Sequence, residues 1–177
     1  MDKFVKCQGN IEDWLGKLEL EMQRSCKRLA EMAAMDCLNQ SIRQFTDKSG
    51  GQFALLGLQI SWTAQCTEAL SNAKANKQIM VETNKFQLSV LQDLSAWCLE
   101  DLGTKMNRIK IETLVTIQVH QRDVFADLVK LFKERKLSDA NDFEWLKQCR
   151  FAWVPNATDI HGTGACVISI CDVEYRY

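Results

Sequence analysis

The sequence predicts a mainly α-helical fold, an elongated antiparallel bundle of long helices with a small β element at the C-terminus. The 177 residues include one proline and eight glycines, so most of the chain is without helix breakers. Apolar residues recur at steps of three and four over most of the chain, which is the spacing of a single helix face. After Pro155 the apolar period becomes two, which is typical of a half-buried strand.

The composition is that of an ordinary globular chain. Hydrophobic residues make up 46% and charged residues 25%. The 22 basic and 23 acidic side chains give a net charge of -1, which provides no overall field to attract nucleic acid or an anionic membrane. No apolar run approaches the ~20 residues that a bilayer span requires, and the N-terminus lacks a signal-peptide core. We therefore expect neither nucleic acid nor a membrane as a partner.

The first helix is predicted to run from Asn10 to about Phe45. Acidic side chains occupy its early turns and basic side chains follow, an order that suits the helix dipole. A helix of this length would extend on the order of 50 Å, which suits a rod better than a globule. Its apolar stripe consists of Ile11, Trp14, Leu15, Leu18, Met22, Cys26, Leu29 and Ala33.

Gly50 and Gly51 mark the clearest break in the chain. Two successive glycines end a helix readily and permit positive φ in the connection. The next segment, from Gln52 to about Ala75, opens with the short apolar run FALLGLQISW, which fits either a buried helix or a strand. The rest of that segment has a helical pattern.

Two further helices are predicted, from about Gln78 to Leu102 and from beyond Gly103 through Lys136. The β-branched cluster at 115–119 lowers local helix propensity, so any bend in the second of these helices is expected there. The expected buried face of the first comprises Ile79, Phe86, Val90, Leu94 and Trp97, flanked by Leu91, Cys98 and Leu102. That of the second comprises Ile109, Leu114, Ile117, Val124, Leu128 and Leu131.

Residues 114–153 read as the end of one helix, a polar turn and a second, capped helix. Ser138, Asn141 and Asp142 are residue types that accept hydrogen bonds from the amides at a helix start. Glu144 follows Asn141 by three residues, which is capping-box register. The second helix is expected to carry the aromatic side chains of Phe143, Trp145, Phe151 and Trp153.

A strand is predicted at the C-terminus, where apolar residues alternate with charged ones. The alternating apolar residues are Cys171, Val173, Tyr175 and Tyr177. One strand cannot satisfy its own backbone, so it needs a partner, either the segment at 167–170 through a hairpin or a continuation of the chain. The chain thus divides into a helical part at 1–155 and a loop with one or more strands at 156–177.

Several segments carry a family resemblance. VTIQVHQRDVFADLV (115–129) and NDFEWLKQCRFAW (141–153) resemble the C-terminal part of the linker of dynein heavy chains, most closely the axonemal outer-arm type. Weaker similarity extends over GNIEDWLGKL (9–18), QISWTAQCTEAL (59–70) and ISICDVEYRY (168–177), in the order that the family has them. The resemblance therefore spans nearly the whole chain, and it favours helix throughout the ambiguous segment.

The resemblance implies a fragment of a microtubule-based motor. In dynein heavy chains the linker is a helical arch across a ring of AAA+ ATPase modules, and the ring begins shortly after the position where this sequence stops. The implied function is that of a lever that couples ATP-driven changes in the ring to ciliary or flagellar movement. Gly50-Gly51, Gly103 and the loop around Pro155 are the candidate joints of such a lever.

The resemblance also implies partners and a location. The implied partners are the AAA+ ring of the same heavy chain, the microtubule, and dynein intermediate and light chains. The implied location is cytoplasmic, at the cytoskeleton, in the axoneme of a cilium or flagellum. ATP and Mg belong to the ring of the parent, so no cofactor is expected in this chain, and the chain itself is not expected to be an enzyme.

No set of residues predicts a catalytic, cofactor-binding or metal site. Gly162-Thr163-Gly164 lacks the Gly-Lys-Ser/Thr end of a P-loop, whose lysine supplies the required charge. His120 lies near Arg122 and Asp123, but the only other histidine is His161, and neither has a nucleophile motif beside it. A helix-surface or interhelical hydrogen-bonding role is favoured for His120. The cysteines show no CxxC spacing, which argues against zinc.

Eight cysteines and the sequons at Asn39 and Asn156 would fit a secreted disulfide-rich domain. Reduced thiols are favoured, because cysteine within helices at irregular spacing acts as a small buried hydrophobe. The five tryptophans are expected in the core, with Trp153 and Phe151 as the residues best placed to contact a neighbouring domain. The cysteines expected within helices are Cys26, Cys37, Cys66, Cys98 and Cys149.

Two functions of different classes compete with the lever. A freestanding helical adaptor that binds partner helices predicts a self-contained fold with a polar surface, whereas the lever predicts an exposed apolar edge at 171–177. A secreted helical domain predicts four disulfides among the eight cysteines.

Overall fold

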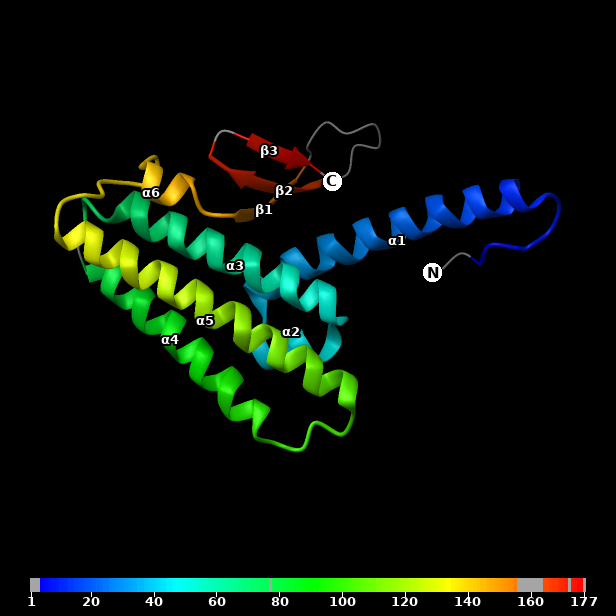
Figure 1. Cartoon of the computed structure of the whole chain (residues 1–177), viewed down its shortest axis with the longest axis horizontal. Helices are drawn as coiled ribbons and strands as arrows, with labels where there is room; N and C mark the ends of the chain where they lie inside the picture. The colour runs from blue at the N-terminus through cyan, green and yellow to red at the C-terminus, as the bar shows by residue number, and fades with distance from the viewer. Residues whose placement is uncertain (1–3, 77, 156–163, 172, 177) are drawn as a thin grey trace.

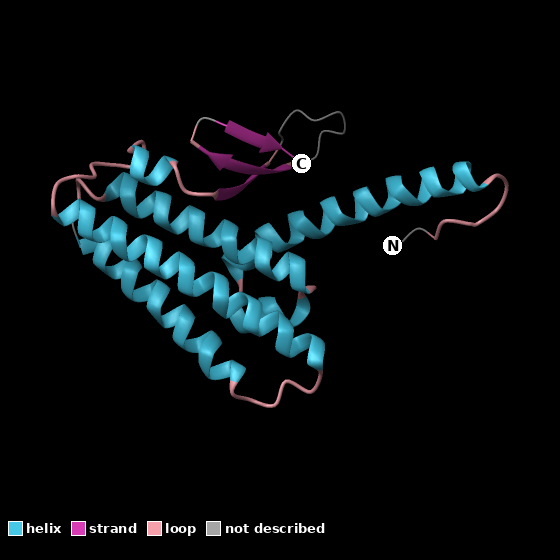
Figure 2. Cartoon of the chain, viewed as in Figure 1, coloured by secondary structure: helices cyan, strands magenta, loops and turns pink. Residues whose placement is uncertain are grey.

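The computed structural model describes residues 4–76, 78–155, 164–171 and 173–176, and within these ranges the mainly α-helical prediction is confirmed. Helices α3, α4 and α5 form an antiparallel body, α1 projects away from it, and the sheet lies beside α3 (Figures 1 and 2). The elements are α1 (Ile11–Asn39), α2 (Ile42–Lys48), α3 (Gly51–Asn72), α4 (Gln78–Cys98), α5 (Lys105–Lys133), α6 (Phe143–Leu146), β1 (Arg150–Val154), β2 (Ala165–Ile170) and β3 (Val173–Arg176).

The predicted first helix is in fact two helices, so the expectation of one helix to Phe45 was wrong. The break falls at Gln40 and Ser41, and the Ser41 side chain caps α2 by accepting a hydrogen bond from the Gln44 N–H. Most of α1 has no side chain buried against the body, and Figure 1 shows it extending into solvent. The buried residues of α1 lie near its C-terminal end, at Ala30, Ala33 and Ala34.

The ambiguous apolar run after the glycine pair is helical. Gly50 has a φ of -61°, so the connection between α2 and α3 does not use positive φ. Gly57 lets α1, α2 and α3 approach closely, because a Cβ at this position would lie 3.1 Å from the Ala33 carbonyl oxygen and would overlap the Phe45 ring. The length of α3 and its burial on several sides decide in favour of helix over strand.

Gly103 marks a helix boundary as predicted, with a φ of 69° between α4 and α5. Thr104 caps α5, since its hydroxyl accepts a hydrogen bond of 3.2 Å from the Asn107 N–H. α5 continues through 115–119 without a break, because packing against α4 outweighs the weak helix propensity of that cluster. α5 ends at Lys133 rather than Lys136. Two residues later, Arg135 has a left-handed backbone conformation, with a φ of 59°, which stops the helix.

The buried faces of α4 and α5 match the predicted ones in part, since Leu94, Trp97, Leu114 and Leu128 are buried as predicted. Phe86 and Ile109 were expected in the core but are 49% and 44% exposed. Gln87, Gln118 and Phe125 are buried instead. The prediction followed apolar residues alone, whereas the true faces include glutamines.

Two apolar clusters fill the body, and a layer of glutamines lies between them. Gln118 donates a hydrogen bond of 2.8 Å from Nε2 to Gln87 Oε1, and Gln87 donates one of 2.7 Å from Nε2 to Gln65 Oε1. We call Gln65, Gln87 and Gln118 the glutamine layer. One cluster includes Trp62, Cys66, Leu70, Met80, Phe125 and Trp145. The other includes Ala33, Phe45, Leu58, Leu94, Trp97, Ile111 and Leu114.

The second helix of the 114–153 segment is a single turn, α6. Its N-cap is Asp142 rather than Asn141, because the Asp142 carboxylate accepts a hydrogen bond of 3.2 Å from the Glu144 N–H. Trp145 is fully buried, with its ring centroid 5.3 Å from that of Trp62. Phe151 and Trp153 lie on strand β1, so their assignment to the helix was wrong.

The three strands form an antiparallel sheet in the order β1-β2-β3. Of the two partners considered for the C-terminal strand, the segment at 167–170 is the one observed, in a hairpin that pairs Ile168 with Tyr175. Cys171 lies in the turn with a φ of 51° and donates a 2.7 Å hydrogen bond from its N–H to the Leu146 carbonyl, so it is not part of the strand. β3 is exposed along its length rather than half-buried, and Tyr177 lies outside the described residues. β1 precedes Pro155, and no sequence signal had suggested it.

Candidate interaction surfaces

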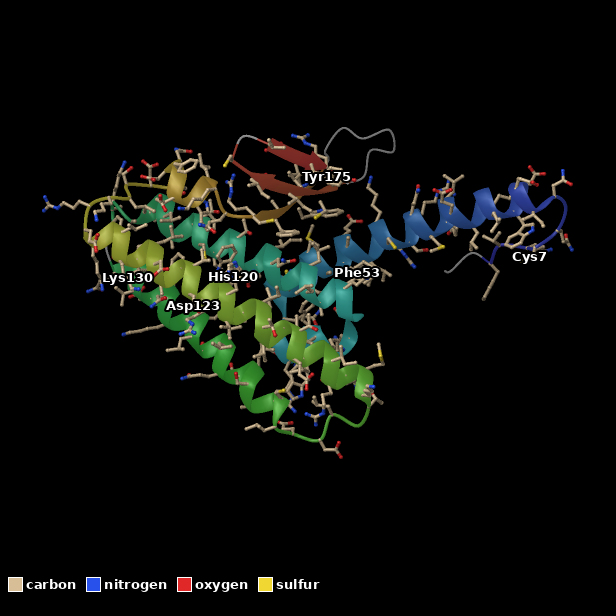
Figure 3. All side chains as sticks on the ribbon, viewed as in Figure 1. Cys7, Phe53, His120, Asp123, Lys130 and Tyr175 are labelled. Carbon is tan, nitrogen blue, oxygen red and sulfur yellow. The ribbon has the colours of Figure 1, made fainter. Side chains whose placement is uncertain are left out.

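The residues weighed for catalysis do not form a site. His120 is exposed on α5, and next to it Arg122 pairs with Asp123 at 3.0 Å between Nη2 and Oδ1. Asp123 is exposed on α5 as well, and both residues are labelled in Figure 3. Among the described residues, no three His, Cys, Asp or Glu side chains are grouped so that they could hold a metal ion. His161 lies outside the described ranges.

Gly164 is the described part of the candidate phosphate loop, and it has a packing role. A Cβ at Gly164 would lie 2.7 Å from the Trp153 ring, so the glycine makes room for that indole. Gly162 and Thr163 lie outside the described ranges.

Cys37 and Cys66 are poor nucleophiles. Burial raises the pKa of the Cys37 thiol to about 11 and that of Cys66 well above its ordinary value. The thiolate, which is the reactive form, is therefore scarce at neutral pH. All eight thiols are unpaired, and Cys149 lies beyond the end of α6 rather than within a helix.

The first exposed apolar surface is the outer part of the sheet. We call Ile170, Val173 and Tyr175 the sheet patch; their side chains are 46%, 72% and 62% exposed. The strand register places all three on one face of the hairpin, and the free edge of β3 runs beside them. The apolar edge that the lever hypothesis predicted at 171–177 is therefore present in its described part.

The second surface is a groove of about 530 Å³ between α1, α3 and β1. The sheet is held to α3 beside this groove by the Phe151 N–H, which donates a 3.0 Å hydrogen bond to Thr63 Oγ1. The groove is mainly apolar, and its lining includes Met35, Leu38, Ile60, Phe151 and Trp153. No local pattern in the sequence predicts this groove, because three elements far apart in the chain create it.

The third surface is a row of apolar side chains along α1. We call Ile11, Leu15, Leu18, Met22, Leu29 and Met32 the α1 stripe; each is at least 36% exposed. Trp14 beside the stripe is only partly buried, so the expectation that it lies in a core was wrong. Trp62, Trp97 and Trp145 are buried as predicted.

None of the helices in the described part of the chain is long and apolar enough to cross a membrane.

Comparison with known proteins supports the resemblance. The chain is 38% identical over 179 residues to rat "Dynein axonemal heavy chain 5" and 39% identical over 180 residues to human "Dynein axonemal heavy chain 8". It is 36% identical over 176 residues to the Chlamydomonas reinhardtii "Dynein gamma chain, flagellar outer arm". These matches cover 99 to 100% of this chain.

The matches cover only 4 to 5% of the length of these relatives, and no protein-family model matches the chain. A similarity of this extent over the whole chain indicates common ancestry. The chain is thus homologous, along its whole length, to one short segment of axonemal dynein heavy chains, among them a flagellar outer-arm chain.

Proposed function

We propose that this chain is the ring-proximal part of the linker of an axonemal dynein heavy chain and acts as a stiff lever. The similarity over its whole length to axonemal heavy chains carries this proposal. The parent is a microtubule motor of the cilium or flagellum that uses ATP and Mg in its AAA+ ring, together with intermediate and light chains. In this view residues 1–155 form the helical lever and 156–177 lead toward the ring.

The packing of the body suits a lever. α5 is a continuous helix of 29 residues, and the 21-residue α4 packs along it. A close-packed helical interior compresses little, so a force applied at one end reaches the other with little loss. The candidate joint at Gly50-Gly51 is tied to α5, because Lys110 Nζ donates hydrogen bonds to the carbonyls of Thr46 (2.8 Å) and Ser49 (3.2 Å). The proposed bending therefore takes place elsewhere.

The sheet patch and the groove suit contact with a neighbouring domain. Both lie on the sheet side of the body, and both expose large apolar side chains. In the proposed lever they contact the ring of the same heavy chain, with Phe151 and Trp153 reached through the groove.

The lever role is tested by softening α5 within an intact heavy chain. Thr116 and His120 are exposed and lie one turn apart on the same side of α5. Glycine at both positions makes the helix more flexible, while alanine at both keeps it stiff and removes the same side chains. We expect Thr116→Gly with His120→Gly to lower microtubule gliding velocity at unchanged ATP turnover, and the alanine pair to leave both near normal. Equal velocities for the two pairs would count against a lever.

A freestanding helical adaptor is the second candidate. The exposed α1 stripe offers it a surface for a partner helix, although an apolar stripe departs from the polar surface that this function predicts. The coding sequence downstream of Tyr177 distinguishes the two functions. A Gly-x-x-x-x-Gly-Lys-Thr loop within roughly the next fifty residues supports the motor, and a stop codon supports the adaptor.

A further inference from the structure

A cavity of about 190 Å³ lies where the end of α1 and the start of α2 meet the body. α3, α4 and α5 contribute the rest of its lining, which includes all three members of the glutamine layer. Leu38 and Phe86 also line it and are 57% and 49% exposed, so the cavity reaches the surface beside them. The space is smaller than the roughly 300–1,000 Å³ of a site for a drug-sized ligand, so it suits a molecule of about ten non-hydrogen atoms.

The hydrogen bonds of the glutamine layer all run in one direction. Each amide nitrogen donates to the next amide oxygen, from Gln118 through Gln87 to Gln65. The series ends at Ser61, whose Oγ accepts a hydrogen bond of 3.1 Å from Gln65 Nε2. One end of the series therefore keeps an amide oxygen as an acceptor, and the other keeps a hydroxyl proton as a donor.

Two buried side chains that line this cavity have a polar atom without a partner. Gln118 is 0% exposed, and its Oε1 accepts no hydrogen bond from the described residues. Trp62 is 4% exposed, and its Nε1–H has no acceptor within the same part of the chain. A buried polar group without a partner is costly. A molecule that brings one donor and one acceptor into this cavity would remove that cost.

The lining indicates the chemical class of that molecule. No described residue of the lining is an Asp, Glu, Lys, Arg or His, and burial raises the pKa of the Cys37 thiol to about 11, so it too is neutral. An ionic ligand would therefore lie there without a counter-charge, which is unfavourable. Phe45, Trp62 and Phe86 supply aromatic surface against which a flat ring packs well. An uncharged aromatic molecule with both a donor and an acceptor matches the site.

We propose that this cavity binds a small uncharged aromatic amide, that is, a flat ring that carries a primary carboxamide. The amide N–H groups donate to Gln118 Oε1, and the amide carbonyl accepts from Trp62 Nε1–H or the Ser61 hydroxyl. The bound molecule contacts residues from α1 to α5, so it stabilises the corner at which α1 joins the body. The proposal rests on this cavity and does not depend on the lever role, so either can fail without the other.

The experiment uses the whole chain and three probes of nearly equal size and shape: benzamide, acetophenone and benzoate. Acetophenone has a methyl group in place of the amide nitrogen, and benzoate carries a negative charge. In an NMR titration that follows the Trp62 indole N–H, we expect benzamide to bind with a dissociation constant on the order of 1 mM. Acetophenone should bind about tenfold more weakly because it lacks the donor. Benzoate should bind at least as weakly as acetophenone, since its charge would be unpaired.

Matched variants test whether the cavity itself is the binding site. Val90 lines it, whereas Val81, 38% exposed on the same helix, does not. Val90→Phe should abolish benzamide binding and Val81→Phe should leave it nearly unchanged, with circular dichroism showing that both variants fold. Gln118→Met keeps the length of the side chain but removes its amide, so it should make the affinities for benzamide and acetophenone equal.

Four results would each overturn the proposal. They are no binding of benzamide, equal affinities of the unaltered chain for benzamide and acetophenone, benzoate binding as tight as that of benzamide, and equal losses in the two valine variants. A Gln118→Met chain that folds and still prefers benzamide would contradict the assigned hydrogen bond.

Discussion

The body and the α1 arm, residues 11–29, have similar apolar content but opposite degrees of burial. In the body, Trp145 and Phe125 are fully buried among α3, α5 and α6. In the arm, no side chain is buried, although its apolar residues are as regularly spaced as those of α5. The difference teaches that a helical stripe in a sequence predicts the need for a partner and does not say whether the partner lies in the same segment.

The largest expected effect comes from removing the buried tryptophan side chain at the centre of the body. Trp145→Ala removes a fully buried indole that packs on Trp62, and it should lower the free energy of unfolding by about 3–5 kcal/mol. Trp14→Ala in the arm should change it by less than about 0.5 kcal/mol, since that ring has no core around it. Urea unfolding followed by circular dichroism measures both. Similar losses would show that the arm and the body are not distinct in stability.

The next prediction concerns the close packing of α1, α2 and α3 where the arm joins the body. Gly57→Ala forces a methyl group against the Phe45 ring and should destabilise the chain by about 1–3 kcal/mol. Gly16→Ala in the arm meets nothing within 4 Å and should instead increase helix content, because alanine favours helix over glycine. Thermal melts give the first result and the circular dichroism signal at 222 nm, the usual helix band, gives the second. A stable Gly57→Ala variant would contradict the described packing.

An effect of similar size is expected at the glutamine layer. Gln87→Leu leaves Gln65 Oε1 without its donor and removes the oxygen to which Gln118 donates, so the free energy of unfolding should fall by about 1–3 kcal/mol. Gln23→Leu in the arm removes only an exposed 3.4 Å hydrogen bond to Glu19 and should have almost no effect. Urea midpoints compare the two variants, and an unchanged midpoint for Gln87→Leu would mean that the layer contributes nothing to stability.

The smallest expected effect concerns the surface of the body. Hydrogen bonds from Arg43 lower the pKa of the Glu100 carboxyl below its ordinary value of 4.5. A lowered folded-state pKa stabilises the fold above pH 4.5, and that contribution is lost as the pH falls through the folded pKa. The loss should be slight because both side chains are exposed and screened. Melting temperatures measured from about pH 7 to about pH 3 should fall less for Glu100→Gln than for Glu12→Gln, the control in the arm.

The sequence predicts the helical elements well and their environments less well. Gly103 and the start of α1 were recognisable from local chemistry, since a glycine and an acidic first turn act within a few residues. The break at Ser41 was missed because a serine can lie within a helix or cap the start of one. Its role as the N-cap of α2 depends on the turn of the chain, which the sequence does not reveal. Strand β1 was missed because its aromatic residues follow a capped turn and fit helix or strand equally over so short a length.

The surfaces were predictable in part. The apolar edge of the sheet was expected from alternation and from the family resemblance, and it is present at Val173 and Tyr175. The exposed α1 stripe and the groove were not expected, because each depends on where other elements end in space rather than on a local pattern. Heptad spacing was visible in α1, but in a sequence it marks a buried and an uncovered stripe equally.

The glutamine layer has a consequence for how the body responds to force along its length. If α4 slid past α5 by one turn, about 5.4 Å, Gln87 and Gln118 would move into the apolar clusters with their amides unpaired. Purely apolar faces would tolerate such a shift far better, since leucine meets leucine in either register. The hydrogen-bonded amides therefore act against axial shear, and the two helices should move together rather than creep past one another when they are pulled.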